Sequence, residues 1–221
     1  MNKISTFFAI ATLAVACHAI VGVDLSSLFS QSTWDCLAKN GYTFALVRCY
    51  RSIDSPDANC PASVERAWAA GMKRVDAYMF PCAKCGNYSG QVTRFYEHLT
   101  KNNVKYTGVW LDIEGIGTHW YDDLKKNQKI FDAFMTAARN TFGRKFVGVY
   151  VSQRSWHGIF GDDYKDWGDL KVWFAKWDHT PGPGSWTPYG GFKSATIHQY
   201  EGDAKVCNAN VDLDYVSSLD Y

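Results

Sequence analysis

Two acidic residues, Asp112 and Glu114, stand at the end of an apolar run and are separated by a single residue. Residues two apart on a β-strand share a face, so both carboxyls project together while Leu111 and Ile113 project away from them. Two carboxyls held close in a desolvated setting repel each other, and one keeps its proton near neutral pH. Such an acid can protonate the leaving oxygen of a glycosidic bond. The spacing alone is also compatible with a strand end whose acids are solvated.

Acidic residues follow two further apolar runs. Asp24 ends the first run, and Asp212 and Asp214 lie in the last one. Each has a plain alternative, since Asp24 could cap a following helix and Asp212 could belong to a turn. Three predicted strands that end in acids at one rim are harder to attribute to chance. We therefore expect these carboxyls to share one site.

Aromatic residues mark the same strand ends. Tyr78 and Phe80 share a face, as do Trp173 and Trp177, and Tyr150 follows in another predicted strand. Aromatic rings stack on the apolar C–H faces of sugars, so this rim suits a glycan-binding cleft. The chain has 9 Trp, 13 Tyr and 13 Phe, so most of its aromatic residues must belong to the core.

The elements that carry these residues alternate between strands and helices. β-Branched and aromatic runs predict strands at 20–25, 43–50, 74–80, 106–113, 145–152, 171–177 and 195–200, with a short eighth at 211–215. Helical spacing of apolar residues predicts helices at 61–72, 89–101 and 122–141. After Ser152 the clear helical patterns stop, so the last third is expected to be irregular.

This alternation predicts right-handed crossovers and a parallel sheet, either open or closed. Seven or eight strands in about 200 residues favour a closed α/β fold, an irregular TIM-like (β/α) barrel with helices mainly in the first two-thirds. Functional residues of such barrels gather at the carboxyl ends of the strands. We expect residues 20–221 to form one barrel domain.

Composition excludes several classes of protein. A chain that is 47% hydrophobic can bury a core, and 23 basic against 22 acidic residues give no bulk charge for nucleic acid or an anionic membrane. Lys3 precedes an apolar stretch at 7–17, which is shorter than the roughly 20 residues that span a bilayer. Residues 1–19 are therefore predicted to be a signal peptide, and the mature protein is expected to be secreted or lumenal.

The cysteines fit an oxidising compartment. Once Cys17 leaves with the signal peptide, six remain: Cys36, Cys49, Cys60, Cys82, Cys85 and Cys207. An even set predicts three disulfides, and the sequence does not choose among the fifteen pairings. Cys82 and Cys85 have no second pair, and the histidines show no ligand spacing, so we predict no metal site and no cofactor. Asn87-Tyr88-Ser89 is a possible glycosylation acceptor.

Five segments together resemble one enzyme family. They are Gly-Val-Asp-Leu-Ser at 22–26, Leu-Asp-Ile-Glu at 111–114, Gly-Val-Tyr-Val-Ser at 148–152, Gln-Tyr at 199–200 and Val-Asp-Leu-Asp at 211–214. In this order they resemble glycoside hydrolase family 25, the Chalaropsis-type lysozymes, over essentially the whole mature chain. The cysteines resemble those of secreted protist and nematode members.

The resemblance implies an irregular β/α barrel that cleaves the β-1,4 bond between N-acetylmuramic acid and N-acetylglucosamine in bacterial peptidoglycan. By position, Glu114 matches the general acid and Asp112 its partner. The remaining matches are Asp24 and Asp212 as further active-site acids, and Tyr78, Tyr150, Trp177 and Gln199 as substrate contacts. Members often carry Asn where Asp214 stands, and this extra acid could shift the pKa of Asp212. We expect a monomer.

Two other functions remain open at this point. A non-catalytic barrel could bind peptidoglycan in the same cleft without cleaving it. A chitinase-like hydrolase needs further acids upstream at two-residue steps, and Trp110 occupies the nearest such position. The sequence also does not separate a retaining mechanism, in which the substrate's N-acetyl group attacks, from an inverting one.

Overall fold

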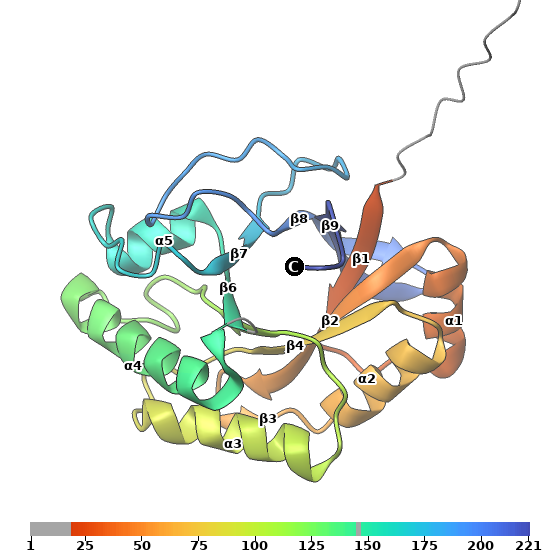
Figure 1. The fold of residues 1–221 in the computed structure, drawn as a ribbon, viewed down its shortest axis with the longest axis horizontal. Helices are drawn as coiled ribbons and strands as arrows, with labels where there is room; N and C mark the ends of the chain where they lie inside the picture. Colours follow the sequence, from red (N-terminus) through yellow and green to blue (C-terminus); the bar gives the residue numbers. More distant parts are fainter. Residues whose placement is uncertain (1–18, 145–146) are drawn as a thin grey trace, which may run out of the picture.

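The computed structural model describes residues 19–144 and 147–221, so the predicted signal peptide lies almost entirely outside the described residues. Eight strands of this part of the chain form a closed barrel (Figure 1). They are β1 (Ile20–Leu25), β2 (Tyr42–Arg51), β4 (Arg74–Met79), β5 (Val109–Asp112), β6 (Val147–Val151), β7 (Lys171–Ala175), β8 (Ile197–Val206) and β9 (Ala209–Val216). Closure comes from β1, which pairs with both β2 and β9, while the two-residue β3 (Ser55–Pro56) pairs only with the end of β2.

The barrel is mixed rather than wholly parallel. Neighbouring barrel strands from β1 through β8 run parallel, as predicted, but β9 is antiparallel to both β8 and β1, and the short β3 outside the barrel is antiparallel to β2. The reason lies in the connection between β8 and β9, where Cys207 and Asn208 both have positive φ angles, 54° and 59°. Two successive residues of this kind are typical of tight hairpin turns, which join antiparallel strands. The all-parallel prediction was therefore wrong for the last strand.

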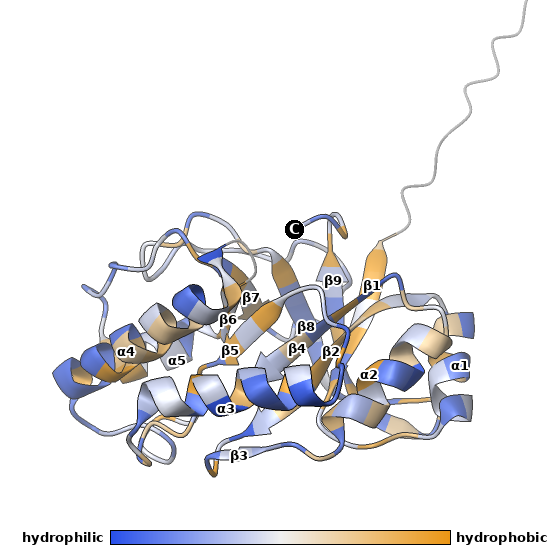
Figure 2. Ribbon diagram, turned by 60° about the horizontal axis from the view of Figure 1, so that its bottom comes forward, coloured by the Kyte–Doolittle hydropathy of each residue, from blue (hydrophilic) through white to orange (hydrophobic). Residues whose placement is uncertain are grey.

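Five helices in the described residues surround part of the barrel: α1 (Gln31–Lys39), α2 (Cys60–Ala69), α3 (Tyr88–Lys101), α4 (Leu124–Phe142) and α5 (Gln153–Phe160). In Figure 1 they lie along the β2 to β6 side, and the described residues place no helix over β8, β9 and β1. Figure 2 shows α3 with much of its hydrophilic surface turned outward. Its buried residues include Val92, Phe95 and Leu99, which recur at helical spacing.

Helices α2, α3 and α4 correspond to the predicted ones, whereas α1 and α5 were missed. Helix α5 contradicts the expectation that helices stop after Ser152. Ser152 is its N-cap, and the Ser155 backbone N–H donates to the Ser152 hydroxyl at 3.0 Å. The helix buries Trp156, Ile159 and Phe160. Its eight residues are too few for a clear helical pattern, which explains the error.

Side chains fill the barrel interior, so the barrel is a packed core rather than a pore. One cluster of buried residues consists of Phe44, Leu46, Tyr78, Trp110, Trp173, Ile197 and Val216. Two glycines make room for the large rings: a Cβ on Gly148 would lie 2.3 Å from the Trp110 ring, and one on Gly22 would lie 2.6 Å from the Phe44 ring. A larger cluster between the strands and the helices forms the rest of the core.

A buried ion pair lies toward the end of the barrel where the parallel strands begin. Arg74 donates to Asp76 at 3.0 Å, and Trp110 Nε1 and the Tyr221 hydroxyl donate to the same carboxyl at 2.9 and 3.2 Å. The Arg74 guanidinium also donates to the Leu219 carbonyl and lies 3.6 Å from the centre of the Tyr221 ring. The last residues of the sequence thus pack into the barrel, where Figure 1 shows the C-terminus near its centre.

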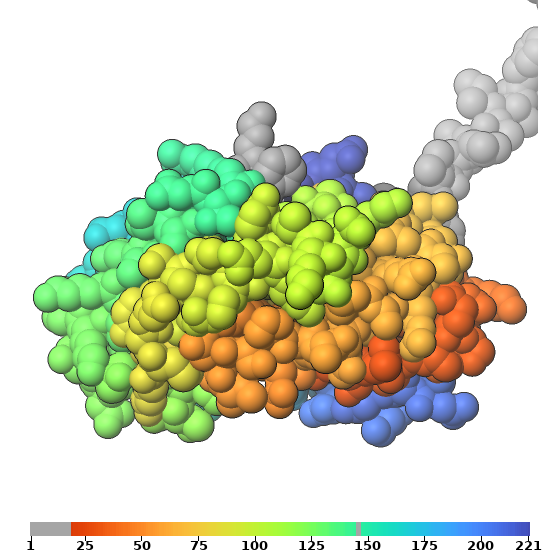
Figure 3. Space-filling view, turned by 90° about the horizontal axis from the view of Figure 1, so that it is seen from below, coloured from red at the N-terminus to blue at the C-terminus, as the bar shows by residue number. Residues whose placement is uncertain are grey.

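The described residues contain three disulfides, as predicted: Cys36–Cys207, Cys49–Cys60 and Cys82–Cys85. The first joins α1 to the β8–β9 turn across 171 residues of sequence. In Figure 3 the turn region, in blue, lies beside α1, in red. Cys82 and Cys85 bond to each other, in agreement with the structural use predicted for them.

Candidate active site

Strand β5 places the first pair of acids at the barrel mouth. Leu111 and Ile113 are buried in the cluster outside the barrel, so Asp112 and Glu114 face the other way, as predicted. Asp112 is only 7% exposed, whereas Glu114 lies past the strand end and is partly open to solvent. Burial raises the pKa of both carboxyls, and the charge of Glu114 raises that of Asp112 further. The pair therefore titrates together and keeps a proton beyond the usual range of an acid.

Strands β1 and β9 place the second pair. Asp24 and Asp212 are direct partners across this antiparallel ladder, and Gln199 of β8 bridges them. Its Nε2 donates to Asp24 Oδ2 at 2.8 Å and to Asp212 Oδ2 at 3.4 Å. Asp212 Oδ1 also accepts from the backbone N–H of Asp203 at 2.7 Å. Burial raises the pKa of both aspartates, so this half of the mouth also favours protonated carboxyls.

Gln199 connects these acids to two aromatic residues. The Tyr150 hydroxyl and Trp177 Nε1 both donate to Gln199 Oε1, at 2.9 and 3.0 Å. Trp177 is 54% exposed, and its ring lies against Gly202. A large exposed aromatic ring, anchored by its N–H at the edge of a group of acids, is a suitable surface for stacking a sugar.

Tyr78 also belongs to the mouth, whereas Trp173, another aromatic residue predicted at this rim, does not. Tyr78 lines a cavity of about 140 Å³ together with Asp24 and Asp212. Phe80 lies beyond the end of β4 and packs against the ring of His119. Trp173 is buried in the barrel interior, because it lies within β7, whereas Trp177 follows the end of that strand.

Comparison with known proteins agrees with this geometry. A family model described as "Lysozyme-like protein 1" matches residues 15–200. Probable GH family 25 lysozyme 5 of Dictyostelium discoideum is 34% identical over 96% of this chain and 97% of its own length. Lysozyme-like protein 5 of Caenorhabditis elegans is 32% identical, with 88% and 90% covered.

The chain belongs to glycoside hydrolase family 25. Its fold also matches solved structures at low sequence identity. A family GH25 lysozyme from Aspergillus fumigatus has a TM-score of 0.70 at 20% identity, covering 91% of this chain and 95% of that one. The bacterial lysozyme from Streptomyces coelicolor has a TM-score of 0.71 at 19% identity, covering 91% and 94%. The irregular α/β barrel predicted from the sequence is thus confirmed.

Sequence reasoning missed one charged residue of this family 25 site. Arg48 lies on β2, and its positive charge offsets part of the rise that burial causes in the pKa of Asp112. Its guanidinium donates to Asp57 Oδ2 at 2.8 Å and to the Ser26 carbonyl at 3.4 Å. A period-two pattern starting from Leu46 could have indicated that Arg48 faces inward.

Asp214, which the sequence marked as an additional acid, is fully buried in the family 25 barrel. Trp173 Nε1 donates to its Oδ1 at 2.8 Å. Burial raises the pKa of Asp214 to about 8, and its charge raises the pKa of Asp24. The neighbouring acid whose pKa Asp214 raises is therefore Asp24, whereas the sequence predicted a shift in the pKa of Asp212.

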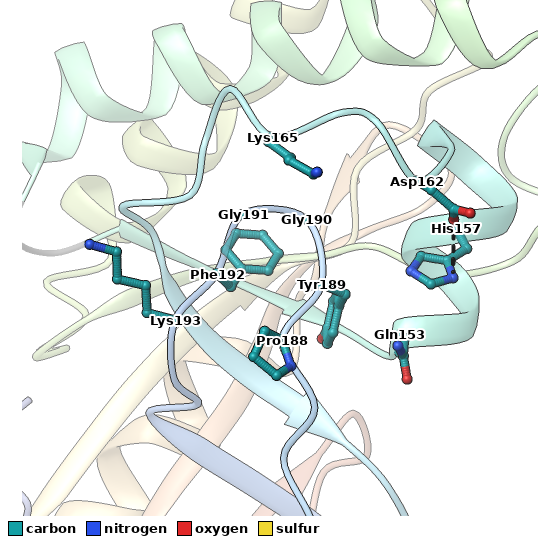
Figure 4. A pocket seen from close by; sticks show the side chains of 10 residues that line it. All are labelled: Gln153, His157, Asp162, Lys165, Pro188, Tyr189, Gly190, Gly191, Phe192 and Lys193. Carbon is teal, nitrogen blue, oxygen red and sulfur yellow. Dashed lines mark ion pairs between the residues drawn. The ribbon is translucent and has the colours of Figure 1, made fainter.

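A larger hollow of about 620 Å³ lies elsewhere, between α5 and the segment that precedes β8 (Figure 4). It is lined by Gln153, Tyr189 and Phe192, and by His157, whose ring nitrogen lies 3.2 Å from a carboxyl oxygen of Asp162. None of the eight predicted site residues lines it. In this family 25 chain the predicted acids thus share the barrel mouth, away from the larger hollow.

Proposed function

We propose that this chain hydrolyses the β-1,4 bond between N-acetylmuramic acid and N-acetylglucosamine of bacterial peptidoglycan, with Glu114 as the general acid. The observation that carries the proposal is the pair of acids at the end of β5, one buried and one at the open mouth. Membership of glycoside hydrolase family 25 supports the reaction class. Peptidoglycan is supported by the lysozyme names of the relatives, and a related autolysin from Streptococcus pneumoniae was solved with a synthetic peptidoglycan ligand.

The proton of the Asp112–Glu114 pair is assigned to Glu114. Burial and the charge of Glu114 raise the pKa of Asp112 well above its usual value, and the positive charge of Arg48 offsets only part of this rise, so the assignment rests on which acid can reach the substrate. Burial and the charge of Asp212 raise the pKa of Glu114, and this rise favours its protonated form. Glu114 is also the more exposed of the two, so it can reach the leaving oxygen of a bound glycan. It would give this oxygen its proton as the glycosidic bond breaks and the ring gains oxocarbenium character.

Asp112 is assigned to orient the substrate. Its Oδ1 is buried and has no hydrogen-bond partner among the described residues. A carboxyl that lacks donors costs about 1–3 kcal/mol, so an N–H of the substrate would be bound favourably at the small part of the Asp112 carboxyl that is exposed. The N-acetyl group of the sugar carries such an N–H. This supports the route in which that group attacks the anomeric carbon, which retains configuration, over attack by water activated at a carboxylate, which inverts it.

The remaining residues are proposed to hold the glycan. Trp177 offers its exposed ring to a sugar face, and Gln199 fixes this ring through the indole N–H. Asp24 and Asp212 present carboxyl oxygens to sugar hydroxyls. Tyr78 and Tyr150 form the polar wall between these acids and the packed interior, since burial and the nearby acids raise the pKa of both and keep them neutral.

We also propose that residues 1–19 are a signal peptide and that 20–221 act as a secreted, monomeric domain. The three disulfides support an oxidising compartment. No helix among the described residues is long and apolar enough to cross a membrane. N-terminal sequencing of protein recovered from the culture medium is expected to begin near residue 20, and an intact Met1 there would contradict the signal peptide.

The test of the proposed reaction is release of reducing ends from purified peptidoglycan, with mass analysis of the products. The wild type should release fragments that end in reducing N-acetylmuramic acid. Glu114→Gln should lower the rate by about 10²–10⁴-fold, because the amide has no proton to give. Glu97→Gln, on the exposed surface of α3, is the matched control and should be fully active. A folded wild type that binds the wall without releasing reducing ends would instead indicate a binding barrel.

A further inference from the structure

Asp214 lies beneath the acids of the mouth, where no substrate reaches it. Its side chain is fully buried on β9. One carboxyl oxygen, Oδ1, accepts a hydrogen bond from Trp173. The other, Oδ2, is buried and receives no hydrogen bond from any fixed donor among the described residues. A buried carboxyl oxygen without a hydrogen-bond donor destabilises the folded protein, so we expect a compensating hydrogen among the neighbouring groups.

The direction of the neighbouring hydrogen bonds is fixed by tryptophans. An indole N–H can only donate, so Asp214 Oδ1 must be an acceptor towards Trp173. At the other end of the network, Trp177 donates to Gln199 Oε1, which turns the Gln199 NH₂ group towards Asp24. Asp24 Oδ2 is therefore an acceptor as well. Each carboxyl thus has one oxygen fixed as an acceptor.

Between these two fixed ends, the Asp24 and Asp214 carboxyls lie within hydrogen-bonding reach of each other. When both are ionised, neither carboxylate can donate a hydrogen bond to the other, and their like charges repel. A single proton between them would complete the chain that runs from Trp173 through Asp214, Asp24 and Gln199 to Trp177. It would also give a further hydrogen bond to the Asp214 carboxyl, which has one oxygen without a donor.

We propose that Asp24 and Asp214 share one proton, and that Asp214 is a positioning residue that holds Asp24 in place for the substrate. The first half of this proposal depends only on the folded protein. The second half rests on the proposed lysozyme function, since it needs a substrate that Asp24 contacts.

The charges around Asp214 favour retention of that proton. The titratable groups that act on it or feel its charge are Asp24 on β1, Asp212 on β9, Tyr200 on β8 and Tyr221 near the end of the chain. Burial raises the pKa of Asp214 to about 8, and Asp212 adds to this increase. The two tyrosines are neutral, because burial raises their pKa as well.

Two substitutions of Asp214 distinguish the effect of its hydrogen bonds from the effect of its packing. Asp214→Asn can accept from Trp173 through its oxygen and donate to Asp24 through its NH₂ group, so it mimics the protonated acid. Asp214→Leu fills a similar volume but can do neither. Both variants remove the shared proton, and only the asparagine variant keeps the hydrogen-bonded chain.

The proton is tested by urea unfolding of the wild type and Asp214→Asn between pH 4.5 and 8. In the unfolded chain an aspartate loses its proton near pH 4, whereas the folded pair keeps one to about pH 8. The folded wild type therefore binds more protons in this window, and its stability falls as the pH rises. Asp214→Asn lacks this loss, so its stability relative to the wild type should increase steadily with pH. A difference that stays constant from pH 4.5 to 8 would overturn the shared proton.

The positioning role is tested by activity on peptidoglycan at pH 6. Asp214→Asn should keep kcat/KM within about threefold of the wild type, and Asp214→Leu should lower it by at least about tenfold, because Asp24 loses its donor. Equal activity of both variants, when both are folded, would overturn the role. If the wild type itself is inactive, the proposed function fails, and the unfolding series still decides whether the proton is shared.

Discussion

Buried carboxyls at the two ends of the barrel differ in their hydrogen-bond partners. One end is the mouth, and the other, the closed end, is where the C-terminal residues pack. At the closed end, Asp76 has no exposed surface and accepts hydrogen bonds from Arg74, Trp110 and Tyr221. At the mouth, Asp112 is almost as deeply buried, yet one of its oxygens has no partner among the described residues. Desolvation is therefore similar at both ends. What differs is whether the fold supplies donors for the charge.

The arginines show the same contrast. Arg74 lies directly against Asp76 at 3.0 Å. Arg48, near the mouth, directs its guanidinium at Asp57 and the Ser26 carbonyl, so it acts on Asp112 only through its field. Hydrogen-bond donors and a nearby cation stabilise the ionised form of a buried carboxyl. Without them, the carboxyl has a raised pKa and an oxygen that is free to accept a hydrogen bond. At the reactive end of the barrel, Asp112 thus lacks the hydrogen-bond donors that Asp76 has at the other end.

The largest expected effect is on stability at the closed end. Arg74→Met leaves Asp76 buried without its cation and should lower the free energy of unfolding by about 3–5 kcal/mol. Urea unfolding at pH 7 measures this loss. Arg144→Met is the control, since Arg144 is 72% exposed where it pairs with Asp169, and it should change stability little. Equal effects of the two substitutions would contradict the contrast between the two ends.

At the mouth, removal of a charge should raise the stability and lower the activity. Asp112→Asn replaces the charged acceptor proposed for the substrate N–H with a neutral amide and should lower kcat/KM by about 10²-fold or more. The same change should raise stability at pH 7, because burial raises the pKa of Asp112 and its ionised form is costly in the folded state. Activity and unfolding are measured on one preparation. Asp76→Asn, its counterpart at the closed end, should instead lose stability, and a stable Asp76→Asn would count against the comparison.

A third prediction concerns packing in the interior. In Gly148→Ala the new methyl group would lie 2.3 Å from the Trp110 ring and 3.0 Å from the Lys171 carbonyl. Overpacking of this kind costs about 1–3 kcal/mol, because neither the enclosed ring nor the backbone can move freely. Thermal or urea unfolding measures it. An unchanged stability would mean that the barrel interior is looser than its close contacts indicate.

Much of this arrangement is local and could be predicted from the sequence. Alternating runs gave the strands, and the two-residue step from Asp112 to Glu114 gave their shared face, because the period of a strand does not depend on its partners. The short helices α1 and α5 have too few residues for a clear pattern. The antiparallel direction of β9 depends on the backbone angles of Cys207 and Asn208, which residue types alone did not indicate.

The hydrogen bonds within the site could not be predicted from the sequence. The bridge from Gln199 to Asp24 spans 175 residues, and the bond from Trp173 to Asp214 spans 41. Such contacts depend on the register of neighbouring strands, so the residue types identify the acids but not which of them share a donor. The period of the strand could have indicated that Arg48 faces inward, but not that its charge acts on Asp112, because this influence crosses from one strand to another.

The smallest expected effect tests whether the mouth differs from the interior in its packing as well as in its charge. In Gly202→Ala the new methyl group would lie 2.1 Å from the Trp177 ring, as close a contact as the one at Gly148. Here the ring is 54% exposed and can move aside, so stability should change little. The displaced ring would stack less well on a sugar, at a cost of about 1 kcal/mol, and KM should rise several-fold with kcat unchanged. Steady-state kinetics on peptidoglycan fragments measures both constants. A large loss of stability with unchanged KM would place Trp177 in the packed core, with no part in binding the glycan.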